Sequence, residues 1–518
     1  MYFSRHKDWI KANYEEYVFI RIVFCVGLVL QLFTSLLSPG FWHHDEHFQL
    51  LEFAGLKAGL TTADDLPWEY YAQIRPAIQP YVALAMLKIF TFFGSDDTFQ
   101  IATALRLLSG FLGWFSSFFL TMAIFPWLPS RLLKRILILL SVLTWFVLFT
   151  HARFSSESWS GSLFFIALGL LIFCIADDNR RKLSLNMLVV GVLLGLSFAF
   201  RYQNGLLLPG LFLWCLFIAK ISIRPVAIMG FGVLAGIACG ILADYFYYNE
   251  WTLAAYNYFV VNITENKAAE FGVSPWYFYL TEFLKWVGWP TGIFILFLLI
   301  VAWVRFPKNI LVWTIVPFIV IHMLIGHKEL RFLFPVIASF PIFIALSLHG
   351  AGPISRYSCI KRYQSAAITF CILAFVIYNT YMLFVYCFNP LQSFIRPLHF
   401  VHKEYSDDHL YLILTNESAF NLITELPMNF YVRENTRPLL LQTSEEILSY
   451  SQHSKKKVLL MLEFRGFELP EKYKLLKPYI KPVYQTIPKA VNINNWANRT
   501  TFWKVYEYSP SQKESLRR

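Results

Sequence analysis

The segment G-F-W-H-H-D-E-H-F-Q-L-L-E at residues 40–52 contains five consecutive ionisable side chains, from His43 to His47. If a helix begins near Asp45, then Asp45, Gln49 and Glu52 are spaced i, i+4 and i+7 and share one face. Asp45 and Glu46 then lie in the first turn, where the helix dipole favours ionised carboxylates. An ionised carboxylate can act as a general base, so Asp45 and Glu46 are candidates for that role. The competing interpretation is an N-cap aspartate before an amphipathic helix.

The same segment raises the question of a metal site, because His43, His44 and His47 flank Asp45. Histidine and carboxylate are common ligands of zinc. Adjacent histidines are, however, expected to project in different directions, and no H-E-x-x-H motif or paired cysteines support zinc binding. We therefore expect no metal ion and no other cofactor.

A second cluster, W-E-Y-Y-A-Q-I-R-P-A-I-Q-P at residues 68–80, contains Glu69 and Arg75. The alternative for this stretch is an interfacial belt of tryptophan and tyrosine. Further polar groups stand beside apolar stretches: R-F-S-S-E at 153–157, R-Y-Q-N at 201–204 and L-A-D-Y-F-Y-Y-N-E-W at 242–251, which includes Asp244. Aromatic rings beside carboxylates and amides suit sugar stacking, although such belts are also routine at membrane interfaces.

A third cluster, G-H-K-E-L-R-F at residues 326–332, places four ionisable residues between two apolar stretches. The charge distribution described below puts this loop on the extracytoplasmic side, where lysine and arginine are normally depleted. Binding of a lipid-linked phosphate would explain the cations. The alternative is a plain ion pair of Glu329 with Lys328 or Arg331.

The composition indicates a polytopic membrane protein. Of 518 residues, 57% are hydrophobic and only 15% are charged, whereas soluble domains carry about 25% charged residues. Apolar runs long enough to cross ~30 Å of hydrocarbon recur along the chain. The net charge of +12 arises mainly from short loops, so it follows the positive-inside rule and does not indicate nucleic-acid binding.

The positions of lysine and arginine predict the topology. Basic connections at 131–135, 180–182, 220–224, 305–308 and 356–362, together with Arg5, Lys7 and Lys11, are expected in the cytoplasm. Eleven spans fit this distribution: 18–38, 101–127, 134–151, 159–176, 184–201, 205–220, 226–244, 287–304, 310–326, 332–349 and 364–388. The apolar stretch 78–93 must then not cross, because counting it would place all five basic connections outside. We expect it to lie on the extracytoplasmic surface or to be re-entrant.

The tail changes character near residue 390. Short strand-like runs at 410–415, 458–464 and 501–508 alternate with helical patterns such as S-E-E-I-L-S-Y-S-Q. This pattern predicts a small α/β domain outside the membrane. We therefore predict a transmembrane catalytic region at 1–388, with an extracytoplasmic catalytic loop at 39–100, and an extracytoplasmic domain at 389–518.

The clusters together resemble glycosyltransferase family 22, the polyprenyl-phosphate-sugar-dependent transferases that share the GT-C membrane fold. The family pattern is H-P-D-E, followed by an aromatic residue and Gln and then by a later Glu. In this sequence the corresponding string is H-H-D-E-H-F-Q, with Glu52 as the later Glu, so His44 stands in place of the proline. The family's Arg-Ser is Arg75-Pro76 here. The other matched segments are Trp68–Pro80, Asp244–Tyr247, Ala255–Asn262, His327–Phe332 and, more loosely, Arg153–Glu157. Residues 271–279, F-G-V-S-P-W-Y-F-Y, resemble the branch that adds the third mannose of glycosylphosphatidylinositol anchors.

The resemblance implies an all-α polytopic fold of GT-C type with about 11 transmembrane helices. It also implies inverting transfer of mannose, or another hexose, from a polyprenyl- or dolichyl-phosphate sugar to a lipid-linked glycan on the extracytoplasmic side. The membrane would be the endoplasmic reticulum or the bacterial inner membrane, and membrane lipids would be partners. In this reading Asp45 or Glu46 is the base, and His327, Lys328 and Arg331 neutralise or position the donor phosphate. The remaining matched residues would bind substrate: Gln49, Glu52, Glu69, Arg75, Arg153 and Asp244.

A transporter or flippase of lipid-linked or anionic substrates is the alternative from another functional class. It predicts ionisable residues near mid-membrane within broken helices, and paired repeats. The sequence instead places most of its charges at one membrane boundary, with Arg21, Lys88 and Arg106 as the main exceptions.

Overall fold

A computed structural model describes residues 14–176, 180–349, 358–406, 409–414, 426–433, 435–486, 495 and 498–509. Several sequence expectations concern residues outside these ranges. They are the amino-terminal basic residues, Arg356 and the last residue of the first expected strand, Thr415. The side chains of the basic residues at 180–182 and 361–362 are likewise not described.

The chain divides into two compact units. The first, here called the helical unit, comprises Met1–Ser38, Ala72–Val82 and Thr103–Asn389. The second, here called the mixed unit, comprises Pro39–Tyr71, Ala83–Ala102 and Pro390–Arg518. The loop that follows the first apolar helix therefore groups mostly with the carboxy-terminal region, which the sequence did not reveal. The expected domain boundaries remain a prediction.

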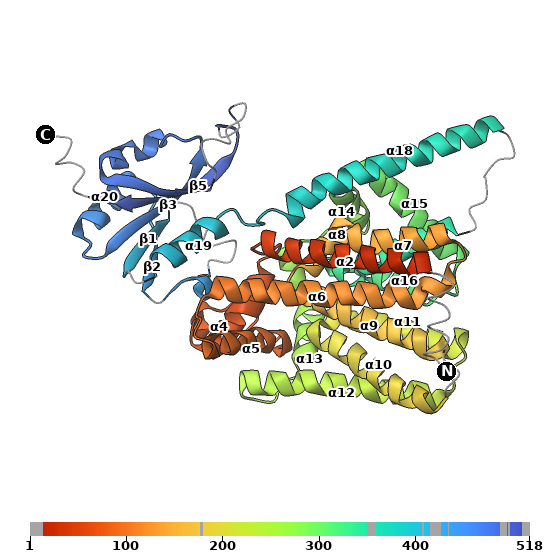
Figure 1. The fold of residues 1–518 in the computed structure, drawn as a ribbon. Helices are drawn as coiled ribbons and strands as arrows, with labels where there is room; N and C mark the ends of the chain where they lie inside the picture. Colours follow the sequence, from red (N-terminus) through yellow and green to blue (C-terminus); the bar gives the residue numbers. More distant parts are fainter. Residues whose placement is uncertain are drawn as a thin grey trace. The chain divides into compact units, whose positions relative to one another are not determined.

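Helices dominate the helical unit (Figure 1). The α-helices are α2 (Tyr14–Leu37), α6 (Thr98–Ile124), α7 (Arg131–Leu143), α8 (Trp145–His151), α9 (Ser156–Ala176), α10 (Arg180–Phe200), α11 (Leu207–Leu213), α12 (Ile223–Tyr248), α13 (Ala254–Phe259), α14 (Phe278–Val287), α15 (Trp289–Arg305), α16 (Ile310–Leu324), α17 (Phe340–Leu348) and α18 (Ser358–Met382). Shorter 3₁₀- and π-helical turns are η3 (Phe125–Trp127), η4 (Tyr202–Leu206), η5 (Trp214–Ile218), η6 (Val260–Thr264), η7 (Lys267–Phe271), η8 (Leu330–Ser339) and η9 (Leu383–Cys387).

Each of the eleven stretches expected to cross the membrane is helical. By length and composition, and within the described ranges, six helices are able to cross a membrane, or seven if the bent pair α7 and α8 forms one span. The other four expected spans contain shorter apolar helices, at 202–218, 289–305, 310–324 and 372–387. The protein is thus a polytopic membrane protein, while the number of eleven spans remains a prediction.

The bend between α7 and α8 has a specific partner. The two helices meet at 46°, and the side chain of Asn379 in α18 contacts the backbone on both sides of the break. Its Oδ1 accepts from the amide of Trp145 at 2.9 Å, and its Nδ2 donates to the carbonyl of Leu143 at 3.0 Å. Backbone groups released by a break in an apolar environment need such partners, so Asn379 stabilises the bend.

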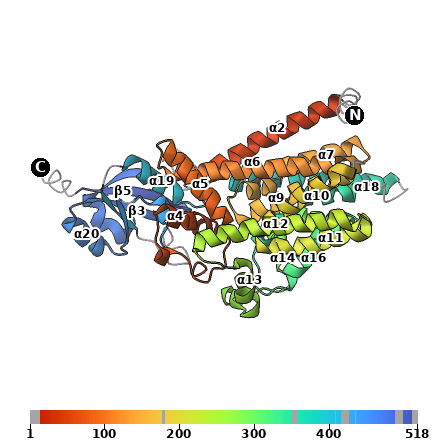
Figure 2. The same ribbon diagram turned by 90° about the horizontal axis from the view of Figure 1, so that it is seen from below.

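Helices α10 and α12 lie side by side in both views (Figures 1 and 2). Glycine residues of both helices lie at their contact. A Cβ atom added to Gly191 would lie 2.0 Å from the carbonyl oxygen of Met229, and one on Gly232 would lie 2.4 Å from that of Leu188. The repeated spacing of small residues four apart lets two membrane helices approach closely. This contact fixes the end of α10, where Arg201 follows.

In the mixed unit, short helices precede the sheet. They are α3 (Asp45–His47), the π-helical turn η1 (Phe48–Glu52), α4 (Phe53–Ala58) and η2 (Ala63–Asp65). Helix α5 (Ile78–Phe92) follows, with residues in both units. The carboxy-terminal elements are α19 (Ile395–Glu404), β1 (Leu410–Leu414), η11 (Asn429–Tyr431), β2 (Thr436–Leu440), α20 (Ser444–His453), β3 (Lys457–Arg465), η12 (Glu471–Tyr479), β4 (Ile480–Gln485) and β5 (Thr501–Tyr508).

The five strands form one mixed sheet in the order β2-β1-β3-β5-β4. Strand β1 is parallel to β2 and β3, whereas β5 is antiparallel to β3 and β4. Helix α20 begins with a capping box, in which Thr443 and Glu446 bond to each other's backbone amides. The small α/β region expected from the sequence is therefore present.

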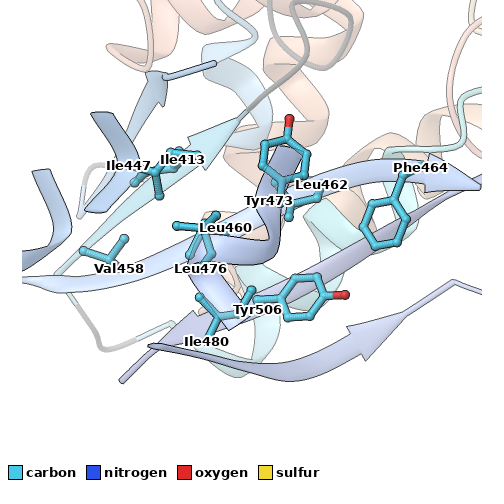
Figure 3. Close-up of a cluster of buried hydrophobic side chains, with 10 residues drawn as sticks. All are labelled: Ile413, Ile447, Val458, Leu460, Leu462, Phe464, Tyr473, Leu476, Ile480 and Tyr506. Atoms are coloured by element: carbon cyan, nitrogen blue, oxygen red, sulfur yellow. The ribbon is translucent and has the colours of Figure 1, made fainter. Parts of the chain in front are cut away.

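The core of the sheet is apolar (Figure 3). Side chains of β1 and β3, including Ile413, Leu460 and Leu462, pack with Ile447 of α20 and Leu476 of η12. Burying each such side chain stabilises the fold by about 1.5–3 kcal/mol relative to leaving it exposed. The sheet therefore has the hydrophobic core of a folded domain.

Candidate active site

The acidic segment of the mixed unit begins a helix at Asp45, as expected, but the helix is not regular. A π-helical turn at Phe48–Glu52 separates α3 from α4. A π turn holds an extra residue and changes the rotation between successive side chains. Asp45, Gln49 and Glu52 accordingly have different partners, and the single polar face expected from i, i+4, i+7 spacing is not the arrangement found.

Asp45 contacts both preceding histidines. Its Oδ1 lies 3.5 Å from Nδ1 of His43 and 3.3 Å from Nε2 of His44. The two imidazole rings are 3.9 Å apart, centre to centre. The expectation that adjacent histidines project in different directions is therefore wrong here. His44 has helical backbone angles, φ −56° and ψ −29°, so successive side chains are not placed on opposite sides as they would be in an extended strand.

Glu46 is buried and holds the backbone of its own turn. Its Oε1 accepts from the amide of Trp42 at 3.3 Å and from the amide of His43 at 3.4 Å. The side chain of Asp45 is 12% exposed. Of the two carboxylates proposed as base, Glu46 is the one whose Oε1 already accepts from two backbone amides.

Gln49 and Glu52 point to different parts of the mixed unit. Gln49 donates to Oε1 of Glu69 at 3.3 Å, and both side chains are buried. Glu52 is fully buried, and its Oε1 contacts Nε2 of His47 at 2.7 Å and the amide of Phe430 at 3.0 Å. These contacts tie the acidic helix to a segment of the carboxy-terminal region. The contacts of Glu52 are therefore with other parts of the protein, which is the pattern of a residue that stabilises the fold.

In the helical unit, Arg75 and Asp244 anchor the segment at 72–82 on helix α12. Oδ1 of Asp244 accepts from the amide of Ala77 at 2.8 Å. The backbone carbonyl of Arg75 accepts from the hydroxyl of Tyr248 at 2.9 Å, and its guanidinium lies 5.9 Å from the ring centre of Tyr258. The structure thus brings these two predicted residues to the same end of α12.

A buried ionic cluster forms where three helical elements meet. Oε1 of Glu157, the second residue of α9, lies 2.9 Å from Nη1 of Arg201 and 3.2 Å from Nη1 of Arg331. Arg331 also bonds through Nε to Glu329. The ion pair of Glu329 with Arg331, the alternative drawn from the sequence, is therefore present within a larger cluster. Sequence reasoning did not select Glu157 and Arg201 as site residues, although both stand in polar segments beside apolar spans.

His327 and Lys328 have separate partners. Nε2 of His327 lies 3.1 Å from Oε1 of Glu329, and this hydrogen bond raises the pKa of His327. The ammonium of Lys328 donates to the carbonyl oxygens of Ser274, Ile325 and Gly326. An ammonium has three donors, so these contacts account for all of them. Burial lowers the pKa of Lys328.

Arg153 is fully buried beside the end of α2. It donates to the carbonyl oxygen of Ser38 at 2.7 Å and to its hydroxyl, and its guanidinium lies 5.4 Å from the ring of Phe149. These contacts connect the segment after α8 with the residue that follows α2. Arg153 is therefore well placed to hold these two segments together.

The many apolar helices of the helical unit define an integral membrane protein, with a small sheet at its carboxy terminus. The sequence pattern of the Alg9-like mannosyltransferase family matches residues 22–433. This match spans well over half of the chain, so the chain belongs to the Alg9-like mannosyltransferase family. Its fold is accordingly of the GT-C type that the resemblance implied.

Individual relatives are distant. GPI mannosyltransferase 3 of Candida albicans is 24% identical over 330 residues, which is 64% of this chain and 63% of the relative. GPI alpha-1,2-mannosyltransferase 3 of Homo sapiens is 22% identical over 353 residues, covering 67% of this chain and 59% of the relative. A probable Dol-P-Man:Man(7)GlcNAc(2)-PP-Dol alpha-1,6-mannosyltransferase of Schizosaccharomyces pombe is 31% identical over 212 residues, covering 40% and 37%. The first three relatives are matched over 59% to 63% of their own length.

Two solved structures are similar at low identity. ArnT from Cupriavidus metallidurans bound to undecaprenyl phosphate is 12% identical with a TM-score of 0.49, over 95% of this chain and 98% of that one. The oligosaccharyltransferase AglB from Archaeoglobus fulgidus, in complex with an inhibitory peptide and a dolichol-phosphate, is 12% identical with a TM-score of 0.47, over 87% of this chain and 70% of that one.

Proposed function

We propose that the protein transfers mannose from a polyprenyl- or dolichyl-phosphate mannose donor to a hydroxyl of a lipid-linked glycan, on the extracytoplasmic or lumenal side of its membrane. The observation that carries this proposal is the family match over residues 22–433, which includes all the proposed site residues. The names of the relatives support mannose as the sugar and dolichyl phosphate as the carrier.

In the proposed reaction, Asp45 removes the proton from the acceptor hydroxyl. The hydroxyl oxygen forms a bond to the anomeric carbon of mannose, and the bond from that carbon to the phosphate oxygen breaks on the opposite face. The configuration inverts, and the polyprenyl phosphate leaves with the electron pair. A phosphate leaving group needs no protonation, so one general base suffices. The choice of Asp45 over Glu46 is supported by the hydrogen bonds of Glu46, whose Oε1 accepts from two backbone amides of its own turn.

In this proposal the arginines of the ionic cluster, Arg201 and Arg331, bind the phosphate of the donor. Arg201 and Arg331 hold two guanidinium groups against one carboxylate oxygen of Glu157. Planar guanidinium forks suit phosphate oxygens, and buried cations stabilise charge that develops on a leaving phosphate. Lys328, whose ammonium donates to three carbonyl oxygens, is assigned to positioning the loop that carries His327 and Arg331.

The assay that tests this function uses the full chain, purified in detergent and supplied with synthetic polyprenyl-phosphate mannose and a panel of lipid-linked mannosylated acceptors. Mass spectrometry is expected to detect an acceptor heavier by one hexose and free polyprenyl phosphate in equal amounts. The same protein is also reconstituted into proteoliposomes. Movement of the intact donor from one leaflet to the other, without any hexose transfer, would contradict the proposal and favour the flippase alternative.

A further inference from the structure

We infer that His43, His44 and Asp45 form a binding site for one divalent transition-metal ion of the zinc type. Within the part of the chain that the structure describes, these three residues form the one group of histidine, cysteine or carboxylate ligands whose atoms all lie within 4.8 Å of one another. No assigned role of the protein involves such an ion.

The distances fit the ion. In a tetrahedral zinc site with bonds of about 2.0–2.2 Å, two ligand atoms lie about 3.3–3.5 Å apart. Oδ1 of Asp45 lies 3.5 Å from Nδ1 of His43 and 3.3 Å from Nε2 of His44. Two of the three edges of the ligand triangle therefore have the required length, and all three ligand atoms lie within 4.8 Å of one another.

Nδ1 of His43 also accepts a hydrogen bond from the backbone amide of Asp45 at 3.3 Å. This contact holds the imidazole ring beside Asp45, and an ion bound to Nδ1 takes the place of the hydrogen bond. Imidazole and carboxylate together favour zinc and its neighbours over magnesium or calcium, which prefer all-oxygen sites.

The backbone around the site is held in place. Glu46 accepts from the amides of Trp42 and His43, so its buried carboxylate fixes the turn that carries the first ligand. Groups that orient the ligands reduce the entropy lost on binding and are a regular part of metal sites. The second ligand, His44, stands where the family pattern has proline, so the site is a property of this sequence rather than of the pattern.

Three protein ligands leave a coordination position for water or a substrate oxygen. If Asp45 is the base of the proposed transfer, the ion and the acceptor hydroxyl compete for one carboxylate, and the ion inhibits. That consequence depends on the proposed function. The binding site itself does not, because ion binding is measured without donor or acceptor.

The experiment uses the full chain, purified with a histidine-free affinity tag, treated with EDTA and titrated with Zn²⁺ by calorimetry and with Co²⁺ by visible absorption. We expect one ion per chain. His44→Ala and Asp45→Asn are each expected to weaken binding at least about 100-fold, since loss even of outer-shell partners costs about 10- to 100-fold. His453→Ala, which removes an exposed histidine of α20, is the matched control and should bind as the parent does.

Three results would overturn the inference. They are the absence of stoichiometric binding by the parent, binding that survives both His44→Ala and Asp45→Asn, and binding that His453→Ala removes. Thermal unfolding of each variant in the absence of metal is measured in parallel. If His44→Ala does not fold, His44→Gln takes its place, because glutamine keeps a polar side chain of similar length but is a poor zinc ligand.

Discussion

Arg201 and Arg331 form a shared ionic contact that the sequence did not predict. Both are buried and contact the same oxygen of Glu157. The prediction from the loop at 326–332 selected Arg331 but not Arg201. The loop sequence could not reveal that Glu157 of α9 and Arg201, which follows α10, lie beside it, because such proximity depends on how separate elements pack.

Replacing either arginine by lysine tests the phosphate assignment. Arg201→Lys and Arg331→Lys keep the charge but lose the planar fork, so each is expected to raise the apparent KM for the donor by about 10- to 100-fold, the equivalent of one charged hydrogen bond. Initial rates over a range of donor concentrations measure this. Arg135→Lys, which changes an arginine paired with Glu16, is the control. If the KM for the donor is unchanged in both variants and the protein yield is normal, these arginines do not bind the donor phosphate.

His327 gives the site a dependence on pH. Its hydrogen bond to Glu329 raises the pKa above the ordinary value of 6.5, so the folded state favours the charged imidazole. The resulting stabilisation is fully present below about pH 6.5 and is lost as the pH rises through the folded-state pKa. The melting temperature of the parent should therefore exceed that of His327→Gln by more at about pH 6 than at about pH 9. A difference that grows with pH would contradict the ion pair.

At the scale of elements, the sequence predicted the helices well because apolar runs of span length have few alternatives. Two strands were missed, β2 and β4. Each contains a proline, Pro438 and Pro482, and proline normally argues against a strand. Both strands occupy edges of the sheet, where a missing amide is tolerated. The π turn at 48–52 was also missed, because no local pattern marks it.

The contact of α10 with α12 predicts a contrast between two glycines of α12. Gly232→Ala places a Cβ 2.4 Å from the carbonyl oxygen of Leu188, so the helices must separate and α10 can no longer hold Arg201 in place. Gly230→Ala meets no atom closer than 3.8 Å. We expect Gly232→Ala to cost about 1–3 kcal/mol, as overpacking does, and Gly230→Ala to be neutral or slightly stabilising. Thermal unfolding in one detergent compares them, and equal melting temperatures would contradict the close packing.

The predicted topology requires that helix α5 does not cross the membrane. It has 15 residues and so rises about 22 Å, less than the ~30 Å of a hydrocarbon core. If it does not cross, Ser95 is extracytoplasmic. A Ser95→Cys variant in a cysteine-free background should react with a membrane-impermeant thiol reagent only from that side. Labelling only from the cytoplasm would show that α5 crosses the membrane, and each later loop would then lie on the side opposite to the one predicted.

At the scale of the whole molecule, the sequence predicted a polytopic membrane region and a small α/β region, but not how the first loop is grouped. The loop shares a unit with the carboxy-terminal residues through contacts such as Glu52 with the amide of Phe430 and His47 stacked on Tyr431 at 5.3 Å. These partners are more than 370 residues apart in sequence. Hydrophobic periodicity reports on local structure, so it carries no information about such pairs.

We propose that Asp45 is the base in mannose transfer, so the decisive measurement is the rate of hexose transfer by Asp45→Asn. Asparagine is close to aspartate in shape but cannot take a proton. The control is Asp64→Asn, which changes an exposed aspartate of the same loop. Rates are measured by mass spectrometry on equal amounts of folded protein. We expect a rate about 10²- to 10⁴-fold lower for Asp45→Asn and an unchanged rate for Asp64→Asn. An Asp45→Asn rate within about twofold of the parent would contradict it.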